Sequence, residues 1–187
     1  TGEPKSLVPF AASSIPLVTL GTFLLWFGWF GFNGFSQLAM GTFDDVNAIS
    51  KIAVNTHLAG AAGTVTAAVV SRLLGGKTDI IMMLNGALAG LVAITAEPLT
   101  PSPLLAIVIG AIGSVIMYFG TKFLEARHLD DVVGAIPVHM FAGIFGTLVV
   151  PISNSDTSFG TQFTGVISVC LFSFIPVSYT HLRAHET

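Results

Sequence analysis

Charge is scarce in this sequence, and that scarcity excludes most soluble proteins. Only 9 % of the 187 residues are Asp, Glu, Lys or Arg, whereas soluble domains carry roughly 25 %. Hydrophobic residues make up 52 %, and the mean hydropathy is +0.83. The net charge of −3 is spread along the chain, and no basic run of the kind that binds nucleic acid is present. The composition therefore predicts a multi-pass membrane protein with no nucleic-acid partner.

Cysteine is nearly absent as well. Cys170 is the single cysteine and lies in an apolar run, which excludes a disulfide framework and a cysteine metal cluster. The sequence also lacks a phosphate-binding loop, zinc-ligand spacing and a Ser–His–Asp arrangement. We therefore expect neither an enzyme nor a bound metal or cofactor. No cleavable signal peptide is visible, and the chain begins without Met close to its first apolar segment, so we expect a longer parent chain.

Long apolar intervals are what the sequence has instead, and the few charges separate them. Because lipid offers no water to backbone N–H and C=O groups, such segments must be helical, and the alternation typical of membrane strands is missing. The sequence therefore predicts an all-α integral membrane fold with about six transmembrane helices. The predicted spans are 15–38, 52–74, 80–96, 104–124, 132–150 and 159–176.

Residues 177–187 break this pattern, because they are polar, basic and rich in histidine. They resemble translated adapter or vector sequence, so we expect a non-native tail and leave His181 and His185 out of the functional site. A native cytoplasmic tail is the alternative, since polar termini are common.

Basic residues sort to one side of the predicted membrane, which sets the orientation. The opposite side carries only Lys51, beside several carboxylates. By the positive-inside rule the basic side is cytoplasmic, so the first span runs outward and Phe32 lies near the outer face. The cytoplasmic set is Lys5, Arg72, Lys77, Lys122 and Arg127.

His139 is the candidate for a pore or relay residue. It lies near the centre of the 19-residue segment 132–150, which contains no formal charge. A polar group at that depth is costly without a partner, and intramembrane ionisable residues usually mark a site or pathway. The alternative is a hydrogen bond to a neighbouring helix, which is also what we expect of His57.

The first span contains WFGWFGFNGFS at residues 26–36, and two interpretations of it stay open. Glycine at every third position keeps one side of the helix thin, which suits close helix packing. Alternatively, Phe32 and Ser36 are four residues apart and share a face. An aromatic ring beside a hydroxyl at the outer mouth can hold a small cation.

Four motifs together resemble the ammonium transporter family (Amt/Mep, related to Rh proteins), and its Amt/Mep branch in particular. They are WFGWFGFNGFS, NTHLAGAAG, NGALAGLVAIT and DDVVGAIPVHMFAGIFGTL, in the family's order and spacing. The resemblance covers residues 12–175, the second half of a family member. It implies that residues 1–176 form a partial ammonium transporter domain.

The resemblance carries further expectations. Family members have eleven helices in two inverted five-helix repeats plus a last helix, so this chain would supply helices six to eleven. They form homotrimers in the plasma membrane with one pore per subunit, and the resemblance implies a cytoplasmic PII-type protein as regulatory partner. External ammonium is captured, deprotonated and passed as ammonia through an apolar pore between two histidines. Potassium has no proton to give up, so deprotonation acts as the selectivity filter.

Site residues follow from matching positions. His139 matches the second pore histidine, and Phe32 matches an aromatic gate below the capture site. Ser36 matches the capture-site hydroxyl, Trp29 a pore-side tryptophan, and Thr95 a polar position near the outer vestibule.

This sequence departs from the family pattern at three places. The partner histidine and the capture-site tryptophan belong to the first half, which has no counterpart here, so transport by this chain alone is in question. Gly134 stands where many members carry an acidic residue, and Phe35 stands where a small residue is common. Two other functions stay open: a proton-coupled carrier of another small solute, and a non-transporting ammonium sensor on the same scaffold.

Overall fold

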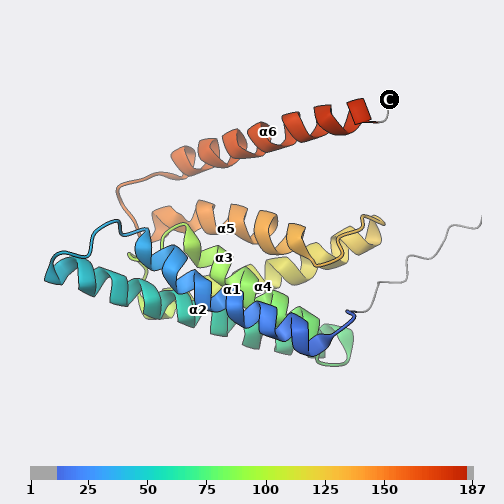
Figure 1. Cartoon of the computed structure of the whole chain (residues 1–187), viewed down its shortest axis with the longest axis horizontal. Coiled ribbons are helices and arrows are strands. Elements are labelled where there is room, and N and C mark those ends of the chain that lie inside the picture. Colours follow the sequence, from blue (N-terminus) through green and yellow to red (C-terminus); the bar gives the residue numbers. More distant parts are fainter. Residues whose placement is uncertain (1–11, 185–187) are drawn as a thin grey trace, which may run out of the picture.

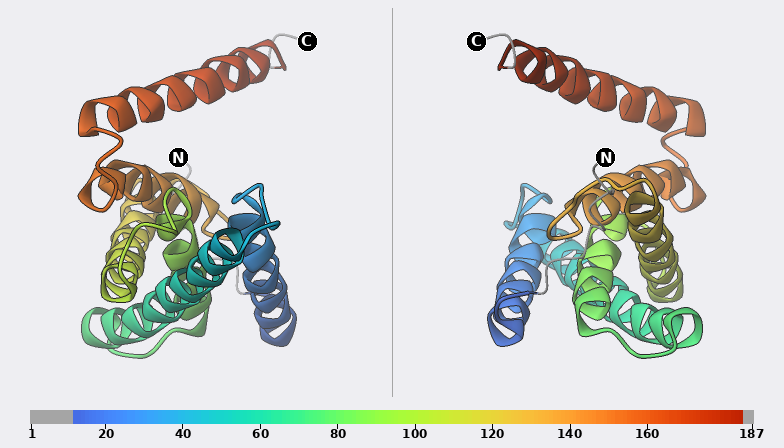
Figure 2. Two further views of the ribbon diagram at one scale, coloured as in Figure 1. Left: turned by 90° about the vertical axis from the view of Figure 1, so that its left-hand side faces the viewer. Right: turned by 90° about the vertical axis from the view of Figure 1, so that its right-hand side faces the viewer.

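The fold is all-helical, as the sequence predicts. The computed structural model describes residues 12–184, which contain no strand (Figures 1 and 2). Four helices are long and apolar enough to cross a membrane, namely α1, α2, α4 and the part of α6 up to residue 178. The elements are α1 Ile15–Phe35, α2 Phe43–Gly75, α3 Ile80–Thr95, α4 Pro103–Ala126, η1 Ile136–Phe141, α5 Ala142–Val149, η2 Val150–Ile152 and α6 Phe159–Ala184.

Short polar side chains set where the helices begin. Ser14, Asp79 and Ser102 each accept a hydrogen bond from an N–H in the first turn of the helix that follows, which satisfies otherwise unpaired donors. Thr42 and Asp45 form a reciprocal capping box at the start of α2. This box begins α2 nine residues before the predicted start at residue 52, so the prediction was wrong there.

Small residues bring α2, α3 and α4 into close contact. A side chain at Gly90 or Gly110 would collide with the carbonyl oxygen of Ala59, and one at Gly63 would collide with Gly86. Ala59 and Ala67 are completely buried in these contacts. The small residues of α2, α3 and α4 therefore let these helices approach closely, as small residues do in membrane helices.

The glycines of α1 behave differently. A side chain at Gly28 would meet no atom within 4 Å, and one at Gly34 would make an ordinary contact with Ile49 at 3.6 Å. The expected close packing along the whole glycine stripe of α1 is thus absent at Gly28 among the described residues. Asn33 instead joins α1 to α2, because its Nδ2 donates to Thr56 Oγ1 at 2.9 Å in a buried position.

Helix α6 stands apart from the bundle of α1–α4 and runs alongside α5 in the opposite direction (Figures 1 and 2). Among the described elements it packs only against α5 and η2. It continues through Pro176 to Ala184, beyond the predicted end of the span at residue 176. The non-native origin of residues 177–187 stays a prediction. His181 falls in this helix, and His185 lies outside the described residues.

Candidate functional site

His139 lies in a π-helical turn rather than in a regular α-helix. In η1 the N–H of Ala142 donates to the carbonyl of Pro137, five residues earlier. The helical segment was predicted from residue 132, but it begins at Ile136. A turn with Gly134 at φ 73° precedes it, and the Asp131 carboxylate accepts a hydrogen bond from Ala135 N at 2.9 Å. Wide turns of this kind often occur at functional sites.

The side chain of His139 points away from the helix bundle. The turn before it and the helix after it bury every fourth residue, at Gly134, Val138, Ala142, Gly146 and Val150. His139 follows Val138 and is exposed.

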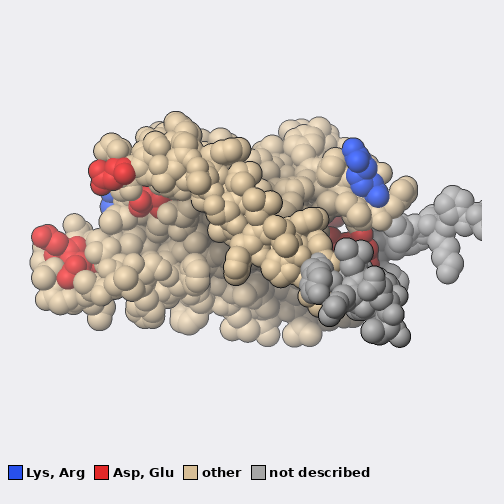
Figure 3. Space-filling model, turned by 90° about the horizontal axis from the view of Figure 1, so that it is seen from above, with Lys and Arg blue, Asp and Glu red and all other residues tan. Residues whose placement is uncertain are grey.

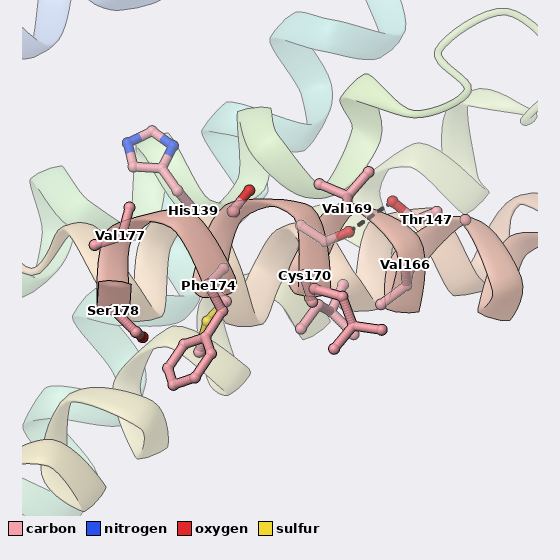
Figure 4. Close-up of a pocket in the computed structure, with 14 residues that line it drawn as sticks. His139, Thr147, Val166, Val169, Cys170, Phe174, Val177 and Ser178 are labelled. Carbon is pink, nitrogen blue, oxygen red and sulfur yellow. Dashed lines mark hydrogen bonds between the residues drawn. The ribbon is translucent and has the colours of Figure 1, made fainter. Parts of the chain in front are cut away.

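Together with Gly143 and Thr147, His139 lines an open groove of about 790 Å³ between α5 and α6 (Figure 4). The groove is mostly apolar, with Ile144 and Phe174 on its walls. Among the side chains that the structure describes, the imidazole makes no hydrogen bond, so the described part of the chain does not supply the partner of the alternative interpretation.

Three of the predicted residues lie together where α1 meets α3. The indole Nε1 of Trp29 donates to Thr95 Oγ1 at 2.7 Å, and Thr95 in turn donates to the Leu91 carbonyl at 2.6 Å. The rings of Trp29 and Phe32 meet edge to face, with their centroids 6.2 Å apart. The Thr95 hydroxyl thus fixes the tryptophan, and the tryptophan supports the phenylalanine.

Ser36 follows one turn after Phe32, at the end of α1. Its Oγ donates to the Phe32 carbonyl at 2.7 Å, so its proton is engaged and its lone pairs remain free to accept. The Phe35 ring beside it is 74 % exposed. A hydroxyl acceptor next to exposed aromatic rings suits a small cation that carries N–H donors.

His139 is not part of this aromatic cluster in the described chain. None of the hydrogen bonds or ring contacts that hold Trp29, Phe32, Ser36 and Thr95 involves it. The link is indirect: Val138, the residue before His139, belongs to the buried apolar cluster against which Trp29 packs. The residue before His139 is thus anchored in the cluster that Trp29 also contacts, while the side chain of His139 faces the groove.

His57 has a different environment from the expected one. Its ring stacks on the Phe30 ring at 6.2 Å and lies tilted against the Trp26 ring at 5.5 Å. Both partners are on α1, and among the described residues the imidazole makes no hydrogen bond to another helix. Asn55, two residues earlier, was not singled out from the sequence. Its Nδ2 donates to the carbonyls of Pro98 and Pro101, at 2.9 Å each. The feature of the sequence that could have indicated this role is an asparagine within an apolar span.

Sequence comparison gives named relatives for almost the whole chain. The family model described as Ammonium Transporter Family matches residues 2–174. Ammonium transporter Amt2 of Archaeoglobus fulgidus is 45 % identical over 163 residues, which cover 87 % of this chain and 33 % of the relative. Putative ammonium transporter sll1017 of Synechocystis is 39 % identical over 165 residues, which cover 86 % of this chain and 37 % of the relative.

Structure comparison agrees with the sequence. A solved structure titled Sensor Amt Protein matches with a TM-score of 0.86 and 34 % identity, over 94 % of this chain and 45 % of that one. Candida albicans Mep2 matches with a TM-score of 0.84 and 25 % identity, over 94 % and 42 %.

The chain thus spans about a third of the length of its curated relatives. The relatives are transporters by name, and the described helices are those of a multi-pass membrane protein. The chain belongs to the Ammonium Transporter Family.

Proposed function

We propose that this chain is the part of an ammonium transporter that holds one pore histidine and one side of the outer capture site. The observation that supports it most is the Trp29–Thr95–Phe32 cluster, with the Ser36 oxygen one turn farther along α1. The names of the relatives supply the substrate, ammonium.

Capture would use the end of α1. The Ser36 oxygen accepts one N–H of ammonium, and the faces of Phe32 and Trp29 attract its charge. Phe32, whose ring is 64 % exposed, then acts as the gate below this position. Thr95 contributes by holding the indole of Trp29.

Passage would require ammonium to lose a proton. An N–H bond of ammonium breaks, and a ring nitrogen of the neutral His139 imidazole takes the proton. The imidazolium then releases this proton to water and becomes neutral again, while ammonia crosses the apolar pore. Ammonium itself would pay a prohibitive desolvation cost there. A histidine can take and release a proton at ordinary pH, whereas potassium offers none, so the same step excludes potassium.

The assembled transporter goes beyond this chain. We place residues 1–176 as a partial transporter domain in the plasma membrane of a microbe, within a homotrimer. A PII-type protein is the proposed regulatory partner on the cytoplasmic side. The spanned fraction of the relatives, about a third, supports the assignment as part of a longer pore.

The function is tested in a chimera, because the chain covers only part of its relatives. Residues 12–174 replace the matching segment of the Archaeoglobus fulgidus relative, and uptake of labelled methylammonium is measured in cells. We expect His139→Ala to lower uptake by about a hundredfold, the scale of a lost proton-transfer group, or to abolish discrimination against potassium.

His128→Asn is the matched control. His128 lies in a loop at φ 54°, which Asn tolerates, so uptake should stay unchanged. Unchanged uptake and unchanged discrimination in His139→Ala would remove His139 from the mechanism.

A sensor that binds ammonium without transporting it is the second candidate. It is favoured by the match to the solved structure titled Sensor Amt Protein, at 34 % identity. The two functions differ in one measurement on the purified chimera. A transporter moves methylammonium into vesicles, whereas a sensor binds it at equilibrium and leaves the vesicles empty.

A further inference from the structure

A side chain from α3 holds the segment that leads into the His139 turn. The amide Nδ2 of Asn85 donates to the backbone carbonyl of Val133 at 3.1 Å. The next residue, Gly134, is buried and has φ 73°. A Cβ at Gly134 would lie 2.6 Å from Asn85 Nδ2. The amide of Asn85 thus occupies the space that a side chain at residue 134 would need.

A second clamp acts on the same turn from within the chain. The two oxygens of the Asp131 carboxylate accept from Ala135 N at 2.9 Å and from Ile136 N at 2.8 Å. These N–H groups belong to the first turn of the helical segment, where no backbone acceptor is available. Asp131 therefore sets where the helical segment begins, and Asn85 ties this start to α3.

The position of this start decides where the imidazole points. In a regular α-helix a spacing of four residues drifts by about 40° per turn. The wide turn of η1 takes up an extra residue, so the buried residues Gly134, Val138, Ala142 and Gly146 keep facing the bundle. A shift of the helix start by one residue would rotate His139 by about 100° around the axis. It would then leave the groove.

Neighbouring helices tolerate only one register of this turn. Gly120 of α4 lies directly under the Phe141 ring, and a Cβ at Gly120 would also lie 3.0 Å from the Cβ of Pro137. Pro137 and Val138 are fully buried against the bundle. The outward direction of His139 therefore follows from contacts that Asn85, Asp131 and α4 make with its backbone segment.

We propose that Asn85 is a positioning residue for His139. The Asn85–Gly134 contact fixes the rotational register of the η1 turn and thereby the direction of the imidazole in the pore. Asn85 itself touches neither ammonium nor the imidazole. The inference rests on the proposed function, in which His139 takes the proton of ammonium.

The first test is Asn85→Asp in the same chimera. The carboxylate has nearly the same shape but accepts only, so it faces the Val133 carbonyl without a bond. We expect uptake per transporter in the membrane to fall at least tenfold, since small misplacements of a catalytic group cost roughly ten- to hundredfold. Above about pH 6, where the introduced carboxylate stays ionised, we also expect a changed pH profile of uptake, whereas a merely structural loss of protein would only scale the profile down. The matched control, Asn47→Asp at an exposed position of α2, should leave both unchanged.

The second test is a double-mutant cycle with Gly134→Ala and Asn85→Ala. If the two residues act as one contact, the double variant loses no more uptake than Gly134→Ala alone. Three results would each overturn the proposal. The first is wild-type uptake and pH profile in Asn85→Asp, and the second is a loss of uptake that less protein in the membrane explains. The third is a double variant whose loss is the product of the two single losses. If His139→Ala still abolishes uptake in that case, the proposed function stands and only the positioning role falls.

Discussion

The hydroxyl of Thr95 accepts one hydrogen bond and donates another, so we expect the stability of the protein to depend on this side chain. It accepts from Trp29 Nε1 and donates to the Leu91 carbonyl. Thr95→Val keeps the shape but leaves the indole N–H without a partner, at a cost of about 1–3 kcal/mol. We expect a lower melting temperature of the purified chimera in detergent. Thr95→Ser keeps the hydroxyl and should melt close to the wild type, and equal melting of Thr95→Val would contradict the role of the bond.

The sequence identified the candidate residues but not their pairings. Trp29 and Thr95 were both chosen by resemblance, yet they lie 66 positions apart, and only helix packing decides that one donates to the other. Asn85 enters the sequence analysis only as the first residue of the NGALAGLVAIT motif, because its acceptor is a backbone carbonyl 48 positions away. Every residue has a backbone carbonyl, so the residue types of the sequence do not indicate which one Asn85 bonds to.

At the scale of helices, packing depends on which glycines face a neighbour. Gly90 faces the Ala59 carbonyl, so Gly90→Ala must push α3 away from α2. Overpacking of this kind costs about 1–3 kcal/mol. Gly28→Ala is the control, because it meets no atom within 4 Å and Ala favours a helix by about 1 kcal/mol over Gly. Melting temperatures in detergent should therefore fall for Gly90→Ala only, and a fall for both variants would contradict this packing.

The helices themselves could be predicted, and their ends only in part. All six predicted spans are helical in the structure, because long apolar intervals between charges leave lipid-exposed backbone no other choice. The starts of α2 and of the histidine segment lie several residues from the predicted ones, because charged residues do not mark where a helix begins. Local side-chain caps override that signal: Thr42 with Asp45 begins α2, and Asp131 begins η1.

At the scale of the whole molecule, the loops sort to two ends. The α2–α3 connection lies at the right of Figure 1 and the α5–α6 connection at the left. At the left end Asn154 Nδ2 donates to the Glu97 carboxylate at 2.7 Å, and the hydroxyls of Thr100 and Ser153 lie 3.0 Å apart. The basic side chains Arg72, Lys77, Lys122 and Arg127 belong to the right-hand end, because they lie in or beside the α2–α3 connection and the end of α4. Figure 3 shows a basic side chain there and acidic side chains at both ends. The sequence predicted this sorting from charge, but not the bonds that join the two left-hand loops.

This sorting predicts the orientation of the chimera in the cell membrane. By the positive-inside rule the end with Arg72 and Lys77 is cytoplasmic, so the α5–α6 loop is external. In a Cys170→Ser background, Ser155→Cys should react with a membrane-impermeant maleimide in intact cells, because Ser155 is exposed in that loop. Thr78→Cys, equally exposed in the α2–α3 connection, should react only after permeabilisation. Neither substitution changes a charge, so neither disturbs the signal that sets orientation. The reverse pattern would place Ser36 on the cytoplasmic side, where it could not capture external ammonium.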